Sequence, residues 1–328
     1  MGLHAQRPSE EGEAAGSVDA SAAAGSRTTH HAPRNRDHAS RITHHAFCIT
    51  ATTCLVGVIG DPIAHSRSPA MHNAAFAALG LDWCYLALHV RPAQLEAALR
   101  GLVALGFVGA NVTIPHKERA AALVDELAPA ARAIGAVNTL TVRGERLLGD
   151  NTDAGGLLMA LAEAGVAVAG EEAVVLGAGG SARAAVYALG GTARAVSVAN
   201  RSLERAEALV GALAPGARAR LEAIPLADAA ALGARLERAA VLVNATPVGM
   251  QPGADESPLP AGVRLPGQLA VLDLVYAPRQ TALLRQAAAQ GCRTVEGLRV
   301  LVHQGALAFE SWTGQAAPIE VMALAAEA

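Results

Sequence analysis

Residues 173–183 read AVVLGAGGSAR, an apolar run that passes directly into a glycine-rich turn. The pattern G-x-G-x-x-A, from Gly177 to Ala182, follows a predicted buried strand and opens an alanine-rich helix over about 184–189. Gly177 permits the tight turn, Gly179 lets the backbone approach a pyrophosphate, and Ala182 lets helix and strand pack closely. The free amides and the dipole at the start of this helix favour phosphate. The stretch therefore predicts a doubly wound α/β domain that binds a dinucleotide.

The strand that follows predicts which dinucleotide is bound. It covers 195–199 and leads into Asn200-Arg201-Ser202, with Arg205 close behind. An NAD-binding fold usually has Asp or Glu here, which accepts from the ribose 2′-hydroxyl. An arginine can instead hold a 2′-phosphate through two hydrogen bonds. A cation at the start of a helix is unfavourable unless it binds an anion, which argues against an ordinary surface role for these arginines. We therefore predict NADP as the cofactor, although Glu204 leaves NAD as an alternative.

Composition excludes several classes of protein. The 328 residues include 26 basic and 29 acidic side chains, for a net charge of −3, whereas polynucleotide binders usually carry a basic excess. No apolar run reaches the roughly 18 residues of a membrane-spanning helix. The four cysteines show no metal-ligand spacing and fit a reducing compartment. We predict a cytoplasmic protein that binds a small molecule, with no nucleic-acid and no membrane partner.

Residues 1–53 differ in character from the rest of the chain. They hold six of the eleven histidines, together with many Ser, Thr and Ala residues, and they show no apolar periodicity. The pairs His30-His31 and His44-His45 could bind a metal, but no Cys or carboxylate framework accompanies them. We predict a disordered extension without a metal site.

The remaining chain alternates strands and helices. Before the glycine turn, apolar patterning predicts strands over 55–60, 83–90 and 109–113, which alternate with helices over 69–79, 92–105 and 118–127. Ser68 is the expected N-cap of the first of these helices. This spacing indicates βαβ units and a parallel sheet. After the turn, strands over 240–244 and 269–274 complete a nucleotide domain that we place at 154–290.

Polar side chains gather at the predicted strand ends of the first domain. They are Ser66, Ser68, Asn111, Thr113, Lys117, Asn138 and Asp153. Taken singly, each has an ordinary role, such as a cap, a turn or a solvated lysine. Taken together, they place hydroxyls, amides, an amine and a carboxylate at one sheet edge, as a polyhydroxylated acid requires. Reduction of a ketone also needs a proton donor, and we predict Lys117 and Asp153 as that acid/base pair.

Ten short motifs identify a resemblance. They are 60–69 (GDPIAHSRSP), 109–117 (GANVTIPHK), 135–139 (GAVNT), 149–153 (GDNTD), 177–180 (GAGG), 200–202 (NRS), 244–250 (NATPVGM), 273–276 (DLVY), 296–298 (EGL) and 301–305 (LVHQG). In this order, over about 55–325, the chain resembles the shikimate dehydrogenases. The resemblance implies reversible reduction of 3-dehydroshikimate to shikimate by NADPH, within chorismate and aromatic amino-acid biosynthesis.

The resemblance also implies a role for each matching residue. The substrate carboxylate would be bound by Ser66, Ser68 and Tyr276, and the hydroxyls by Thr113, Asn138, Asp153 and Gln304, with Lys117 as the catalytic acid/base. The pyrophosphate would meet Gly177, Ala178, Gly179, Gly180 and Ser181, the 2′-phosphate Asn200, Arg201, Ser202 and Arg205, and the nicotinamide end Thr246, Val275 and Gly297. C-terminal helices would return to the first domain, so that 54–153 and 291–328 together form the substrate domain.

Two other functions remain open at this point. A quinate/shikimate dehydrogenase would use NAD, and Glu204 keeps that option. A ligand-sensing paralogue without activity could retain Ser66, Ser68 and the glycine turn while losing the acid/base pair, but Lys117 and Asp153 are both present. The oligomeric state stays open between a monomer and a homodimer.

Overall fold

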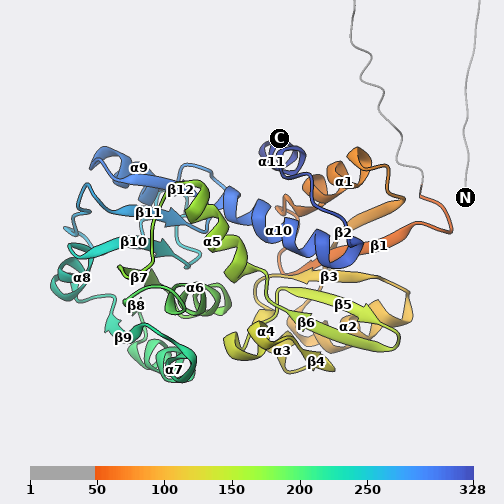
Figure 1. Ribbon diagram of the computed structural model, residues 1–328, viewed down its shortest axis with the longest axis horizontal. Coiled ribbons are helices and arrows are strands. Elements are labelled where there is room, and N and C mark those ends of the chain that lie inside the picture. The colour runs from red at the N-terminus through yellow and green to blue at the C-terminus, as the bar shows by residue number, and fades with distance from the viewer. Residues whose placement is uncertain (1–48) are drawn as a thin grey trace, which may run out of the picture. The chain divides into compact units, whose positions relative to one another are not determined.

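The computed structural model describes residues 49–328, which form two six-stranded sheets flanked by helices (Figure 1). No helix in this range is both long enough and apolar enough to cross a bilayer. The histidine pairs of the predicted extension lie outside the described residues. At the end of that extension, Thr52 and Thr53 donate hydrogen bonds to the carboxylate of Asp82, at 2.9 and 2.6 Å.

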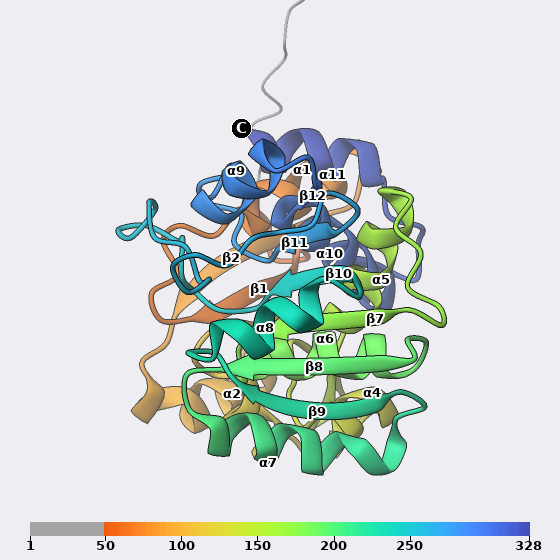
Figure 2. The ribbon, with the colours of Figure 1, turned by 90° about the vertical axis from the view of Figure 1, so that its left-hand side faces the viewer.

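The second sheet is parallel throughout, with the strand order β12-β11-β10-β7-β8-β9 (Figure 2). Its strands are β7 Glu172–Leu176, β8 Ala195–Asn200, β9 Arg220–Pro225, β10 Ala239–Asn244, β11 Ala270–Asp273 and β12 Arg293–Glu296. Counted from β7, this is the 3-2-1-4-5-6 order of a Rossmann fold, with the switch point between β7 and β10. The glycine turn follows β7 at that point, which confirms the predicted fold.

Helices cover both faces of the second sheet. They are α6 Gly180–Gly190, α7 Leu203–Leu213, α8 Ala229–Leu236 and α9 Ala282–Ala289, with a short 3₁₀ turn at Ala214–Gly216. Successive residues of a strand point to opposite faces. Val175 accordingly packs with α6 and α7, whereas Val174 and Leu176 pack with α8 and α9.

The first sheet is mixed: the three predicted strands pair in parallel, as expected, but the sheet continues with an antiparallel strand that was not predicted. Its order is β2-β1-β3-β5-β6-β4, and β5 is antiparallel to both β3 and β6. Its strands are β1 Cys54–Gly60, β2 Trp83–His89, β3 Gly109–Val112, β4 Glu126–Leu127, β5 Thr139–Arg143 and β6 Arg146–Asp150. Antiparallel neighbours need no crossover helix, and a two-residue turn at Gly144 and Glu145 joins β5 to β6.

Four helices accompany the first sheet: α1 Ser68–Ala78, α2 Leu95–Ala104 after a 3₁₀ turn at Pro92–Gln94, α3 Lys117–Ala121 and α4 Pro129–Ile134. Two expectations were wrong in detail. Ser68 is the first residue of α1 rather than its cap, because Arg67 occupies the cap position and no side chain caps the helix. The helix expected over 118–127 ends at Ala121, because Glu126 and Leu127 pair with β6 as β4.

Two helices, α5 Asp153–Glu163 and α10 Gly297–Thr313, pack against each other between the sheets (Figure 1). The chain then returns to the first sheet, as the resemblance implied: Phe309 and Trp312 of α10 pack with α1 and with α11, Ile319–Glu327. The indole of Trp312 donates to the carbonyl of Leu140 in β5 at 2.9 Å. Residues near position 300 therefore lie beside the strand ends of the first sheet.

Candidate active site

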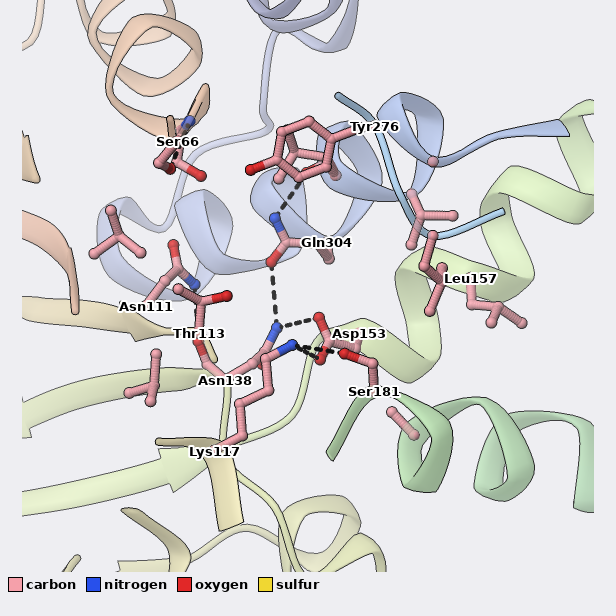
Figure 3. A pocket seen from close by; sticks show the side chains of 18 of the residues that line it. Ser66, Asn111, Thr113, Lys117, Asn138, Asp153, Leu157, Ser181, Tyr276 and Gln304 are labelled. Atoms are coloured by element: carbon pink, nitrogen blue, oxygen red, sulfur yellow. Dashed lines mark hydrogen bonds and ion pairs between the residues drawn. The ribbon is translucent and has the colours of Figure 1, made fainter. Parts of the chain in front are cut away.

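Lys117 and Asp153 form an ion pair at the start of two helices. Lys117 begins α3 after the turn that follows β3, and Asp153 begins α5 after β6. The Lys117 ammonium donates to Asp153 Oδ2 at 2.6 Å, and their side chains are 14% and 16% exposed (Figure 3). Such a pair can hold a proton donor in one orientation against a reacting oxygen.

Lys117 is also the only lysine in the sequence, and the other 25 of the 26 residues counted as Lys or Arg are arginines. Arginine stays protonated under all ordinary conditions, whereas an ammonium group can release and regain a proton. The sequence therefore keeps a lysine at the one place where proton transfer is expected. The presence of a single lysine is visible in the sequence, but the prediction of Lys117 did not use it.

Asn138 connects the ion pair to the rest of the site. Its amide nitrogen donates to Asp153 Oδ1 at 2.8 Å and to Gln304 Oε1 at 3.2 Å (Figure 3). Its amide oxygen accepts from the backbone N–H of Thr152 at 2.7 Å. The Gln304 amide in turn donates to the carbonyl of Leu301. These bonds fix which end of each amide faces the neighbouring group.

A cavity of about 170 Å³ lies over these side chains. Every residue predicted to bind substrate lines it: Ser66, Ser68, Thr113, Lys117, Asn138, Asp153, Tyr276 and Gln304. They come from helices and from loops at the strand ends of both sheets, so the fold brings together positions far apart in the sequence. Burial raises the pKa of Tyr276, against the opposing effects of the Arg67 charge and the Ser66 hydroxyl, and so keeps its phenol a neutral donor.

Two further polar residues line this cavity, Asn111, which belongs to the predicted polar cluster but received no individual role, and His65, which was not singled out from the sequence. The buried Asn111 accepts from the hydroxyl of Tyr85 at 2.7 Å and donates to the carbonyl of Asn138 at 3.1 Å. Tyr85 itself stacks on His72, with ring centroids 4.3 Å apart. Burial lowers the pKa of His72 to about 3, so this imidazole is neutral behind the cavity.

A second cavity of about 660 Å³ adjoins the first, along the glycine turn. Predicted cofactor residues line it: Gly177, Ala178, Gly179, Gly180, Ser181, Asn200, Arg201, Arg205 and Thr246. Gly177 has φ +109°, which favours glycine, and a Cβ on Gly179 would point into open space. No side chain caps α6, so its first amides remain available to a phosphate. These features fit a dinucleotide.

Three predicted cofactor residues lie elsewhere. Gly297 lines the substrate cavity, and Val275 lines neither cavity. Ser202 caps α7, where its hydroxyl oxygen accepts from the backbone N–H of Arg205 at 3.3 Å and its O–H donates to Glu204 at 2.8 Å. The carboxylate of Glu204 is thus held at the start of α7, where its own backbone N–H and Ser202 lower its pKa.

Lys117, Thr113 and Ser181 line both cavities. Ser181, predicted as a cofactor ligand, also accepts a hydrogen bond from the Lys117 ammonium at 3.3 Å. The ammonium therefore stands where the polar cavity meets the glycine turn.

Family models and curated relatives show what this chain is similar to. Residues 58–140 match the shikimate dehydrogenase substrate binding domain, residues 160–249 match shikimate / quinate 5-dehydrogenase, and residues 297–327 match the shikimate 5′-dehydrogenase C-terminal domain. A shikimate dehydrogenase (NADP(+)) from Symbiobacterium thermophilum is 51% identical over 275 residues, which cover 83% of this chain and 93% of the relative.

Solved structures show the same architecture. Shikimate 5-dehydrogenase from Thermus thermophilus, in complex with NADP(H) and shikimate, is 42% identical with a TM-score of 0.74, over 84% of this chain and 99% of that one. Quinate dehydrogenase from Corynebacterium glutamicum, in complex with NAD, is 32% identical with a TM-score of 0.74, over 83% and 98%. The chain belongs to the shikimate dehydrogenase family.

Proposed function

We propose that the chain reduces 3-dehydroshikimate to shikimate with NADPH, and that Lys117 transfers the proton. The observation that carries the proposal is the position of the Lys117–Asp153 pair at the junction of a polar cavity and a phosphate-binding turn. Bound NADPH would supply a hydride to the ketone carbon. Lys117 Nζ would donate a proton to the ketone oxygen as that oxygen gains negative charge, and would regain a proton after product leaves.

The remaining polar groups would hold the substrate in register. Ser66, Ser68 and Tyr276 offer hydroxyls for the carboxylate, at the end of the cavity formed by α1 and the loop after β11. Thr113, Asn138 and Gln304 would bind ring hydroxyls, because each has a side-chain group that both donates and accepts. We assign substrate binding to residues 54–153 and 291–328, and NADP binding to 154–290.

The two arginines on the cofactor cavity support NADP over NAD. Arg201 and Arg205 line it beside the end of β8, where a 2′-phosphate would lie. Glu204 is near, but its carboxylate is bound to Ser202 rather than projecting as a free ribose acceptor. Oxidation of quinate with NAD remains the second candidate function, because the quinate dehydrogenase in complex with NAD has the same fold.

Initial rates decide between the two candidates. Shikimate and quinate are each oxidised with NADP⁺ and with NAD⁺, and kcat/KM is compared across the four pairs. We expect shikimate with NADP⁺ to give the highest value, and a preference for quinate with NAD⁺ would contradict the proposal. We also predict a cytoplasmic protein, since Cys54, Cys84 and Cys292 are free thiols. We predict that it is a monomer or a homodimer, and light scattering would measure its mass.

A further inference from the structure

Arg183, in the first turn of the phosphate-binding helix α6, reaches across to α4 of the first sheet. Its Nε donates to the carbonyl of Ile134, the last residue of α4, at 2.5 Å. Helices α4 and α6 pack against each other, as Figure 1 also shows. A cation beside the carbonyl end of a helix is favourable. Arg183 therefore joins the cofactor helix to the substrate side of the site.

The contact extends to Gly135, which ends α4 in the left-handed conformation with φ +71°. A Cβ at Gly135 would lie 2.8 Å from Arg183 Nη2 and 3.4 Å from Cζ. The planar guanidinium thus covers the backbone of Gly135, and a side chain at this position would force the guanidinium to shift. Only arginine offers both this flat face and the Nε donor.

The loop that Arg183 holds contacts both members of the acid/base pair. Two residues after Gly135, the Val137 N–H donates to the carbonyl of Lys117 at 2.9 Å. The next residue is Asn138, which binds Asp153. From the cofactor side, a Cβ at Gly180 would lie 3.0 Å from Lys117 Cβ. The backbone of Lys117 is therefore held between this loop and the first turn of α6.

We propose that Arg183 is a positioning residue: it fixes the phosphate-binding turn against the loop 135–138 and so sets the position of Lys117 relative to bound cofactor. This inference rests on the proposed function for its kinetic consequence, but not for its structural one. Arg183 lines neither cavity, so it would act through Lys117 and Asn138 rather than through a ligand.

The test compares Arg183→Met, Arg183→Lys and a matched control, Arg132→Met. Arg132 is on α4, the helix that Arg183 contacts. Its guanidinium also donates to a backbone carbonyl, but that carbonyl belongs to Leu127 of β4, in the first sheet. We expect Arg183→Met to lower kcat tenfold or more, with the Kd for NADPH, from fluorescence titration, within threefold of wild type. The kcat of Arg183→Lys should lie between those of wild type and Arg183→Met, and the kcat of Arg132→Met should match that of wild type.

A second readout needs no activity. Because Lys117 is the only lysine, protein labelled with ¹³Cε-lysine gives one side-chain NMR resonance. In ligand-free protein this resonance should shift or broaden in Arg183→Met and stay in place in Arg132→Met. If wild type fails to reduce 3-dehydroshikimate, the proposed function is wrong, and this spectrum still decides the role of Arg183.

Two results would overturn the proposal. One is a folded Arg183→Met variant with wild-type kcat and an unmoved lysine resonance. If Arg183→Met does not fold, Arg183→Lys decides, although its new lysine adds a second resonance: wild-type kcat together with one resonance at the wild-type position of Lys117 would show that Arg183 only stabilises the fold.

Discussion

Gly156 of α5 lies directly against the backbone of Gln304 of α10. A Cβ at Gly156 would be 2.6 Å from Gln304 N and 2.9 Å from its Cα, closer than non-bonded atoms approach. The two helices can cross here only because residue 156 has no side chain. Since Gln304 binds Asn138 and lines the polar cavity, this crossing positions a cavity side chain as well as joining the sheets.

Gly156→Ala should therefore separate α5 from α10 and displace Gln304. We expect a loss of about 1–3 kcal/mol in the free energy of unfolding, as for other overpacked sites, and a five- to tenfold higher KM for shikimate. The Kd for NADPH should stay within about twofold of the wild-type value. Loss of a hydrogen bond to a charged group would change this Kd by far more. Urea denaturation and steady-state kinetics measure these quantities.

Gly101→Ala is the matched control for this variant. Gly101 is also inside a helix, α2, but a Cβ there would meet no atom within 4 Å. Alanine forms helix better than glycine, so this variant should be about 0.5–1 kcal/mol more stable, with unchanged KM. If both alanine variants behave alike, close packing at Gly156 does not matter to the site.

Replacement of Lys117 tests the acid/base assignment directly. Lys117→Met keeps an unbranched apolar stem but has no proton to transfer, so kcat should fall by about 10²–10⁴-fold. Shikimate binding, measured by calorimetry, should weaken only a few-fold, because the other cavity residues remain. Turnover at the wild-type rate would refute the assignment.

The lone lysine allows a chemical version of the same test. Reductive methylation changes amines only, and Lys117 carries the only side-chain amine in the sequence. We expect loss of activity to parallel methylation of Lys117 in peptide mass spectra, and bound shikimate with NADP⁺ to slow both equally. Because a dimethylated amine still binds and releases one proton, full activity after complete methylation would show that simultaneous hydrogen bonds from this ammonium to Asp153 and Ser181 are not needed.

Cofactor choice should depend on the charge at the start of α7. Arg201→Ala removes an exposed cation from the cofactor cavity, so the Kd for NADPH should rise at least tenfold while that for NADH changes little. Glu204→Gln should act in the opposite direction, because it removes a negative charge bound to Ser202. Parallel fluorescence titrations with both cofactors check this, and equal losses for NADPH and NADH would contradict it.

The sequence predicted the parts of this site that depend on local chemistry. The glycine turn could be recognised because its residues are required by backbone geometry and phosphate approach, and the strand and helix around it fit the structure. The hairpin of β5 and β6 was not recognised, because its only strong turn signal is Gly144. Ser68 resembled a helix cap since its type favours caps, but the preceding Arg67 already has helical angles.

Long-range contacts were beyond sequence reasoning. Gly156 within a helix suggests only a weak helix former until the partner, Gln304, is known. Arg183 likewise has no local pattern that predicts a bond to Ile134, because the partner lies on another layer of the fold. The resemblance supplied Gln304 as a substrate residue, whereas composition and periodicity alone did not.

Asp273 provides a test of stability against pH. Its carboxyl is fully buried at the end of β11, and burial raises its pKa from 3.8 to about 6, against hydrogen bonds from Thr281, Val275 and Asn244. The folded protein thus binds this proton more tightly than the unfolded chain does. The resulting stabilisation is complete below the unfolded pKa of 3.8 and is lost as the pH rises through about 6.

Asp273→Asn removes this titration. The free energy of unfolding of wild type, minus that of the variant, should decrease by roughly 2–3 kcal/mol between about pH 4 and pH 6, since one pKa unit corresponds to about 1.4 kcal/mol. Urea denaturation at several pH values gives both curves. Asp228→Asn is the control, because Asp228 is exposed and asparagine caps α8 as well as aspartate does. Parallel curves for wild type and Asp273→Asn would mean that this carboxyl keeps its ordinary pKa despite burial.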